Sequence, residues 1–190
     1  MQRIVIIGVG ALGSHLCLLG RNWDAQLVVV DFDRVEQKNI ASQFHSRMGV
    51  GRNKTQALQQ AMQGLFSLRL EAVPHRFVED NARSLLEGAD LVVDCVDHAG
   101  TRTVIQHVAA ELGLPALHGA LAADGRYARV MWDPAFTVDE GGDGAATCED
   151  GEHLPFVALV AAKMAAVVQR FLSEGVQESV HIRPDGFEAI

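Results

Sequence analysis

Short apolar runs rich in β-branched residues recur along this chain, and longer stretches with a helical period separate them. The runs predict strands at Ile4–Ile7, Gln26–Val30, Leu70–Val73, Leu91–Cys95, Ala116–His118, Tyr127–Trp132 and Val180–Arg183. The first strands are apolar throughout instead of alternating. We therefore expect them to be buried on both faces, as strands of a parallel sheet are.

The stretches between the strands predict helices that begin near Ala11 and cover Thr55–Leu65, Asn81–Leu86, Thr101–Leu112 and Leu154–Leu172. This alternation predicts an α/β fold with a Rossmann-like doubly wound, mostly parallel sheet and helices on both faces. The turn signal Asp124-Gly125 between two predicted strands indicates antiparallel strands toward the C-terminal part. We expect one domain over residues 1–190.

A glycine-rich turn follows the first strand, with Gly8, Gly10 and Gly13 in the spacing G-x-G-x-x-G. The first glycine permits the tight turn, the second lets a phosphate approach the backbone, and the third lets the next helix pack closely. The helix from Ala11 would direct free N–H groups and its positive dipole end at that phosphate. Asp31 ends the second strand, where such folds place a ribose-binding carboxylate. A nucleotide site is predicted, and NAD fits as well as ATP; the alternative is a turn with nothing bound.

The residues after Asp31 distinguish between these nucleotides. The chain continues with Asp31-Phe32-Asp33-Arg34-Val35-Glu36, Asn39, Gln43, Gly51-Arg52-Asn53-Lys54, Asp94-Cys95-Val96-Asp97 and Arg102. This set resembles the ThiF/MoeB/HesA family, the E1-like enzymes that adenylate the C-terminus of ubiquitin-like proteins. The resemblance extends from Arg3 to about Phe171.

The resemblance implies a role for each matching residue. Asp31 is similar to the ribose ligand, and Asn39 to an asparagine beside the phosphates. Lys54 matches the lysine that reaches the ATP phosphates, and Asp97 matches the aspartate that holds Mg²⁺ near the triphosphate. The remaining matches, expected among the nucleotide-binding residues, are Asp33, Gln43 and Arg102.

The chemistry of adenylation agrees with these residue types. A carboxylate attacks the α-phosphorus of ATP and expels pyrophosphate, so the site has to hold two anions together. A lysine, a metal ion and backbone N–H groups can offset that charge, since such catalysis rests on positioning and electrostatics. Mg²⁺ needs few protein carboxylates because phosphates and water fill its other positions. We therefore expect Lys54 and Asp97 to be catalytic and Asp97 to be the metal ligand.

Each of these residues also has a structural alternative. Lys54 could be a solvated lysine on the face of a helix over Asn53–Leu65. Asp97 could be a loop acid or the N-cap of the helix after Gly100, and Asn39 could be a turn residue or a cap. Their joint occurrence at these spacings favours the nucleotide roles.

One position departs from the family pattern. Ser42 stands where the family usually has an arginine before the glutamine, so a small hydroxyl replaces a forked guanidinium that binds phosphate oxygens. The family segment that precedes the first strand and supplies another arginine to a dimer partner is also not expected, because the sequence begins at the strand. Arg47, Arg52 or a partner chain could supply the charge.

Length, composition and charge exclude several classes. A chain of 190 residues with 48% apolar residues can bury its own core, and a net charge of −8 argues against nucleic acid or anionic membrane as main partner. Met1-Gln2-Arg3 leads into a strand, so we expect no signal peptide and a cytoplasmic location. Lys163, Gln169 and Arg170 interrupt the apolar stretch Leu154–Leu172. That stretch predicts a core helix, or alternatively a dimer face, and not a membrane span.

Cysteine usage indicates a reducing compartment, since Cys17, Cys95 and Cys148 are far apart and suggest no disulfide framework. Without a C-x-x-C pair, the structural zinc site of many family members is not expected. Cys17 and Cys95 lie in apolar predicted elements and are expected to be inert core thiols. Cys148 precedes the long helix, where a family cysteine can receive the activated carboxylate as a thioester or acyl-disulfide. Its acidic neighbours would raise the thiol pKa, so an ordinary loop cysteine is the alternative.

Two further features concern the surroundings of the predicted site. Residues 138–151 are rich in glycine and acids and predict a mobile loop, which in the family is a crossover loop that covers the substrate's C-terminal tail. The eight histidines show no metal-ligand spacing. His45 and His98 are expected near the nucleotide but not as catalysts.

We therefore predict an ATP- and Mg²⁺-dependent adenylyltransferase that acts on the C-terminus of a ubiquitin-like or sulfur-carrier protein. The expected assembly is a homodimer or a heterodimer with another E1-like chain. A second hypothesis, favoured by Ser42, is a nucleotide-binding subunit with weak or no catalysis. A third is an NAD-dependent oxidoreductase; Asp31 permits it, but the one tyrosine, Tyr127, lies in a predicted strand and offers no acid–base pair for hydride chemistry.

Overall fold

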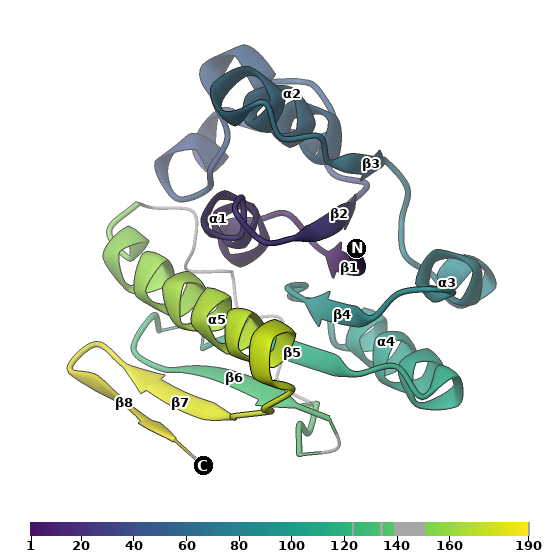
Figure 1. Cartoon of the computed structure of the whole chain (residues 1–190). Helices are drawn as coiled ribbons and strands as arrows, with labels where there is room; N and C mark the ends of the chain where they lie inside the picture. The colour runs from purple at the N-terminus through teal and green to yellow at the C-terminus, as the bar shows by residue number, and fades with distance from the viewer. Residues whose placement is uncertain (123, 134, 139–150, 190) are drawn as a thin grey trace.

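An eight-stranded sheet in the order β3-β2-β1-β4-β5-β6-β7-β8 runs through the molecule (Figure 1). It is seen in a computed structural model that describes residues 1–122, 124–133, 135–138 and 151–189. The strands are β1 (Gln2–Ile7), β2 (Ala25–Val30), β3 (Glu71–Val73), β4 (Leu91–Asp94), β5 (Ala116–Leu121), β6 (Ala128–Trp132), β7 (Val180–Arg183) and β8 (Gly186–Ala189).

The first five strands are parallel and the last three are antiparallel additions. The predicted doubly wound, mostly parallel sheet with antiparallel strands toward the C-terminal part is therefore confirmed. The expectation that Val180–Arg183 is the last strand is wrong, because β8 pairs with β7 through the turn at Pro184 and Asp185.

In the described part of the chain, five α-helices and two short 3-10 helices, named η, surround the sheet. They are α1 (Ala11–Leu19), η1 (Gln37–Ala41), η2 (Arg47–Gly49), α2 (Lys54–Phe66), α3 (Glu79–Leu86), α4 (Ala99–Leu112) and α5 (Leu154–Glu174). Figure 1 shows α3 and α4 on one side of the sheet and α1 and α5 on the other.

Each face of the sheet has its own core. Alternate residues of the central strands, such as Ile4 and Ile6, pack with apolar residues of α1, α2 and α5. Their neighbours Val5 and Ile7 face the opposite way and pack with α3 and α4. Successive strand residues point to opposite faces, so an uninterrupted apolar run is what a strand covered on both sides requires.

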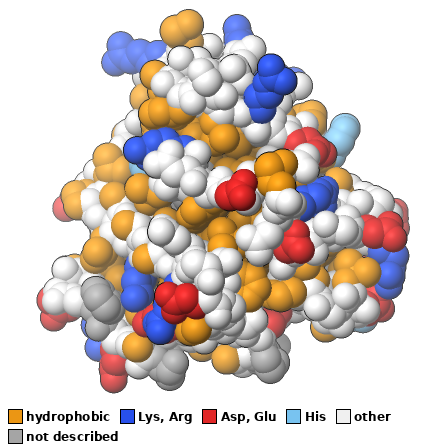
Figure 2. Space-filling view, viewed as in Figure 1, with side chains coloured by type: hydrophobic (Ala, Val, Ile, Leu, Met, Phe, Trp, Pro, Cys, Tyr) orange, Lys and Arg blue, Asp and Glu red, His pale blue; other side chains and the backbone are white. Residues whose placement is uncertain are grey.

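The long helix α5 is apolar and long enough to cross a membrane by length and composition alone. One face of it, including Phe156, Val160 and Met164, is buried in the core, where α5 packs against α1 and β6. The prediction of a core helix is therefore confirmed. Hydrophobic side chains also reach the surface among scattered charged groups in Figure 2; the exposed ones include Leu65 and Phe66 at the end of α2.

Polar caps explain where two site-forming helices begin. The Asn53 side chain accepts hydrogen bonds from the N–H groups of Thr55 and Gln56 at the start of α2. His98 Nδ1 accepts the N–H of Thr101 at the start of α4, at 3.2 Å. Side-chain acceptors at this position satisfy N–H groups that have no partner within the helix.

Candidate functional site

The predicted nucleotide-binding residues gather at the carboxyl ends of β1, β2 and β4. The chain leaves β1 toward β2 on one side, and β4 lies on the other side of β1. Open α/β sheets bind ligands at such a switch point, because the loops diverge there and leave a crevice. The fold therefore places the glycine-rich turn, the Asp31 segment and the Asp97 loop around the same point.

Two glycines are required by contacts within the protein. Gly8 has φ of +85°, and a Cβ on it would lie 2.9 Å from the carbonyl oxygen of Cys95 in the β4–α4 loop. A Cβ on Gly13 would lie 1.9 Å from the Gly8 carbonyl oxygen, which any side chain would displace. At Gly10 the nearest atom is Gln43 Nε2 at 3.9 Å. The space beside Gly10 is thus not filled by the protein itself. A phosphate that approaches the backbone at Gly10 would need such a space.

The Asp31 carboxylate connects the second strand to the glycine-rich turn. Its Oδ2 accepts the N–H of Val9 at 2.8 Å, and its Oδ1 accepts the N–H of Asp33 at 2.9 Å. Burial raises the pKa of Asp31, against the opposing effect of Lys54 and the two backbone N–H groups. An ionised carboxylate has about four acceptor positions, so two more remain for hydroxyl donors.

The Lys54 ammonium lies beside this acidic pair. The segment that follows β2 pairs with the start of α2, and the Lys54 N–H donates to the Asp33 carbonyl at 2.8 Å. Its Nζ lies 3.1 Å from Asp33 Oδ2, with the lysine side chain 10% exposed and the aspartate side chain 49% exposed. A buried cation at a helix N-terminus opposes the helix dipole. Lys54 is therefore a buried, ion-paired side chain and is not the solvated lysine of the structural alternative.

Asn39 is buried and caps the 3-10 helix η1. Its Oδ1 accepts the N–H of Glu36 at 2.8 Å, and its carbonyl accepts the N–H of Gln43 at 2.8 Å. Asn39 is thus the third residue of a capping box in which Glu36 is the N-cap, and a phosphate-side role stays a prediction.

Three buried polar atoms on the next segment have no hydrogen-bond partner in the described part of the chain. They are Ser42 Oγ, Gln43 Oε1 and His45 Nδ1. The other ring nitrogen of His45 lies 2.9 Å from the Val9 carbonyl oxygen, so Nε2 is the donor and Nδ1 carries a free lone pair. Burial lowers the pKa of His45 to about 4, so the ring is neutral near pH 7. Unpaired buried polar atoms are rare in folded proteins.

Asp97 is exposed in the loop between β4 and α4. The alternative that it caps α4 is wrong, because His98 takes that position. Among the candidates to replace the family arginine, Arg47 is exposed in η2, and Arg52 donates a hydrogen bond to Gln60 of α2.

Arg102, a predicted nucleotide-binding residue, is a buried residue of α4 whose side chain is held by contacts within the protein. Its guanidinium lies 3.2 Å from Asp94 Oδ2 and donates to the carbonyl oxygens of Val96 and Gly119. The Asp94 carboxylate also contacts His118 at 2.8 Å. This cluster was not expected from the sequence, which offers as its only signal a histidine within an apolar strand.

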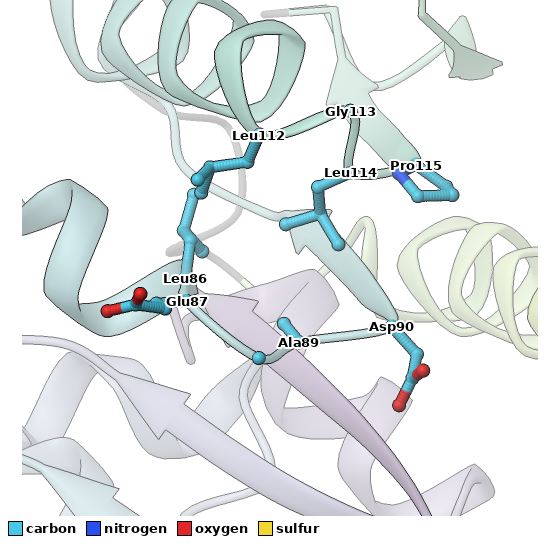
Figure 3. Close-up of a pocket in the computed structure, with 9 residues that line it drawn as sticks. Leu86, Glu87, Ala89, Asp90, Leu112, Gly113, Leu114 and Pro115 are labelled. Carbon is cyan, nitrogen blue, oxygen red and sulfur yellow. The ribbon is translucent and has the colours of Figure 1, made fainter.

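Two of the cavities formed by the described residues are lined by residues outside the glycine-rich turn. One, of about 360 Å³, borders the site at Asn53 and Phe32 and is also lined by Arg34 and Arg52. The other, of about 310 Å³, lies where α3 and α4 end, and Leu86, Leu112 and Pro115 are among its lining residues (Figure 3). That cavity is at the amino ends of β4 and β5, remote from the predicted chemistry.

The structure describes two of the three cysteines, Cys17 and Cys95. Cys148 and most of the predicted loop at 138–151 lie outside the described residues. Burial raises the pKa of Cys17 to about 12 and that of Cys95 well above its usual value. Cys17 is buried in α1, and Cys95, predicted to lie within a strand, follows the end of β4 and is half-buried. The expectation that these two thiols are unreactive is consistent with this burial.

Comparison with known sequences identifies the family. The sequence profile of the ThiF family matches residues 1–181. The chain belongs to the ThiF family. The resemblance inferred from the glycine-rich turn, Asp31, Lys54 and Asp97 is therefore confirmed at the level of the family.

Individual members of the ThiF family resemble the chain over much of its length. The adenylyltransferase and sulfurtransferase UBA4 of Lodderomyces elongisporus is 28% identical over 187 residues, which cover 90% of this chain and 40% of the relative. The sulfur carrier protein adenylyltransferase of Thermus thermophilus is 36% identical over 124 residues, covering 62% of this chain and 45% of the relative. The chain thus spans less than half the length of these curated relatives.

A solved structure shows the same fold. The crystal structure of E. coli MccB with ATP aligns with 100% of this chain and 62% of its own, with a TM-score of 0.77 and 18% identity. This likeness supports the arrangement of strands and helices described above.

Proposed function

We propose that this ThiF-family chain binds ATP with Mg²⁺ and activates a carboxylate by adenylation. The substrate class we propose is the C-terminus of a ubiquitin-like or sulfur-carrier protein. Support comes from the family match and from relatives named as adenylyltransferases, one of which acts on a sulfur carrier protein by its name.

The environment of Lys54 is the observation that carries this proposal. Its ammonium is nearly buried at the N-terminus of α2 and has a half-exposed carboxylate, Asp33, as its ion-pair partner. Burying a cation is expensive unless a partner compensates. A polyphosphate above the glycine-rich turn would give this ammonium a further anionic partner.

The other residues have complementary parts in this proposal. Asp31 would accept ribose hydroxyls while it keeps the Val9 N–H, and the N-terminus of α1 would offer backbone N–H groups to phosphate. Asp97 supplies an exposed carboxylate at the end of β4, which suits a cation that takes its other ligands from phosphates and water. Mg²⁺ bound there would offset charge on the phosphates. Cys148 as acyl acceptor and a dimeric assembly stay predictions.

The three unpaired atoms on Ser42, Gln43 and His45 further support a ligand beside Gly10. One of these residues, Ser42, also favours a second candidate function. Ser42 is buried and uncharged where the family usually has arginine, so the chain could bind nucleotide as a weak or inactive subunit of a heteromer.

Two measurements separate these functions. Calorimetric titration with ATP plus Mg²⁺, and separately with NAD, should show binding of ATP that depends on Mg²⁺ and no comparable binding of NAD. ATP–pyrophosphate exchange with small proteins ending in Gly-Gly should then be rapid. Binding without exchange would support the inactive subunit, and binding of NAD alone would contradict both ATP-based functions.

A further inference from the structure

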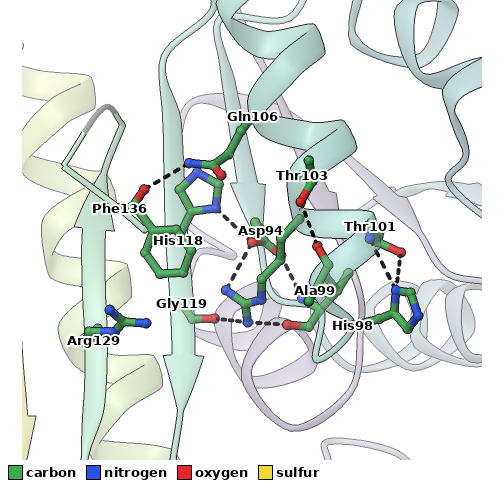
Figure 4. Close-up of polar contacts among 12 residues, drawn as sticks. Asp94, His98, Ala99, Thr101, Thr103, Gln106, His118, Gly119, Arg129 and Phe136 are labelled. Atoms are coloured by element: carbon green, nitrogen blue, oxygen red, sulfur yellow. Dashed lines mark hydrogen bonds and ion pairs between the residues drawn. The ribbon is translucent and has the colours of Figure 1, made fainter. Parts of the chain in front are cut away.

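A buried charged cluster lies under the first turns of α4, beside the proposed site (Figure 4). At its centre is His118 of β5, which is 0% exposed. Its Nδ1 lies 2.8 Å from Asp94 Oδ2, and its Nε2 lies 3.0 Å from Asp133 Oδ2. The Phe136 ring stacks on the imidazole, with centroids 4.5 Å apart.

The contacts of both ring nitrogens fix the number of protons. A neutral imidazole has one donor and one acceptor, whereas an ionised carboxylate only accepts. Both contacts are therefore hydrogen bonds from the ring only if His118 is an imidazolium. With that proton, His118 and Arg102 balance Asp94 and Asp133; without it, the cluster has an unbalanced negative charge.

Three elements that pack around His118 supply the charged groups of this balance. Asp94 comes from β4, Arg102 from α4 and Asp133 from the turn after β6. Arg129 of β6 faces the other side of the cluster, 4.9 Å from the centre of the Phe136 ring. Burial by itself lowers the pKa of His118, but its hydrogen bonds to Asp133 and Asp94 outweigh burial and raise that pKa above its usual value.

The cluster also holds the turn that leads to Asp97. Asp94 Oδ1 accepts the N–H of Val96 at 2.9 Å, and Arg102 donates to the carbonyl oxygen of Val96. Both polar groups of the residue before Asp97 are thus bound to the cluster. Since Asp94 Oδ2 is shared between His118 and Arg102, a change at the imidazole acts directly on the carboxylate that anchors this turn.

We propose that His118 is a positioning residue, held as an imidazolium between Asp94 and Asp133, that fixes the turn presenting Asp97. When the ring loses its proton, one nitrogen lone pair faces a carboxylate, and that contact becomes repulsive. Loss of the proton on Nδ1 takes a donor from Asp94 and loosens the Val96 turn, whereas loss of the proton on Nε2 takes a donor from Asp133. The consequence for Mg²⁺–ATP binding rests on the proposed function, whereas the fixing of the turn does not.

Nuclear magnetic resonance of the full chain tests this without any ligand. In the wild type, both ring nitrogens of His118 should be protonated at pH 7 and titrate above the ordinary value of about 6.5. The backbone amides of Val96 and Asp97 should shift with the same midpoint. The matched control is His107→Gln, which removes an exposed histidine of α4 paired with Glu111 and should leave these amide titrations unchanged.

The variant Asp133→Asn tests the proton count. An asparagine amide can donate to Nε2, so a neutral ring suffices and the His118 midpoint should move about one pH unit or more to lower pH. Raising the pH through the wild-type midpoint should also weaken Mg²⁺–ATP binding by the wild type about fivefold, which is the effect of one lost hydrogen bond. The same pH change should leave Mg²⁺–ATP binding by Asp133→Asn unchanged.

Each outcome decides a different point. A His118 ring that is neutral at pH 7, or Val96 and Asp97 amides that ignore its titration, would overturn the inference. A wild-type chain that binds no ATP at any pH would refute the proposed function, while the ring and amide titrations would still decide the role of His118. If Asp133→Asn does not fold, the wild-type titration decides alone.

Discussion

Replacing Lys54 by methionine should separate its cost to the fold from its contribution to nucleotide binding. Methionine keeps the buried stem and removes the charge. The lost ion pair with half-exposed Asp33 contributes at most about 1 kcal/mol. Removing a cation from the N-terminus of α2 returns about 0.3–1 kcal/mol. The two effects nearly cancel, so we expect the free energy of unfolding of the ligand-free protein to change by less than about 1 kcal/mol.

Nucleotide binding should respond far more strongly. A charge-assisted hydrogen bond to phosphate contributes about 1.5–3 kcal/mol, so Lys54→Met should weaken Mg²⁺–ATP binding about ten- to hundredfold. Binding of AMP, which lacks the outer phosphates, should change much less. Lys38→Met is the matched control, because Lys38 is exposed and pairs with Glu36. Urea unfolding and calorimetry measure both effects. Unchanged ATP affinity together with a loss of stability above about 3 kcal/mol would show that Lys54 is a structural ion-pair residue.

Three further predictions concern the turn, a buried histidine and the thiols. In urea unfolding, Gly13→Ala should lower the free energy of unfolding by about 3 kcal/mol, because the new Cβ would lie 1.9 Å from a carbonyl oxygen. The control Gly64→Ala, which has open space around it on α2, should raise the free energy of unfolding by about 0.5–1 kcal/mol. Because the pKa of His45 is lowered to about 4 in the folded protein, the unfolded chain takes up the proton at a higher pH than the folded chain does. The free energy of unfolding should therefore fall by about 3 kcal/mol as the pH drops from 6.5 to 4. An equally steep dependence of the free energy of unfolding on pH in His45→Gln would contradict this. Iodoacetamide at pH 7.5 should leave Cys17, whose pKa is raised to about 12, unmodified, and labelling that persists in Cys148→Ser by mass spectrometry would argue against Cys148 as the reactive thiol.

The parts of the site that sequence could predict depend on local spacing. The glycine-rich turn and the helix after it are close in sequence, so their geometry follows from the strand–turn–helix order. Asp31 binds the Val9 N–H because both follow the ends of adjacent strands. The pairing of Lys54 with Asp33 was not foreseen as a contact, although both residues belong to the recognised motif.

Other parts depend on strand register, which no local pattern fixes. Asp94 meets His118 because these two residues are partners in the β4–β5 pairing, and Asp133 is brought back by the β5–β6 hairpin. The end of β4 was misplaced by one residue because the Asp94 side chain binds the Val96 N–H and turns the backbone there. The strand β8 was missed because Gly186–Ala189 lacks the β-branched run that marks the other strands.

The central position of β1 has a consequence for how the protein reaches its native state. This strand is made well before β4, yet it pairs with β4, so that Ile7 has Asp94 as its partner, and the helix that follows it packs against α5. Contacts between segments so far apart in sequence close slowly, because loop entropy has to be overcome first. During synthesis the apolar face of α1 stays uncovered until residues 154–174 have left the ribosome. The glycine-rich turn is thus translated well before α5 but has its packing completed only after α5 is made.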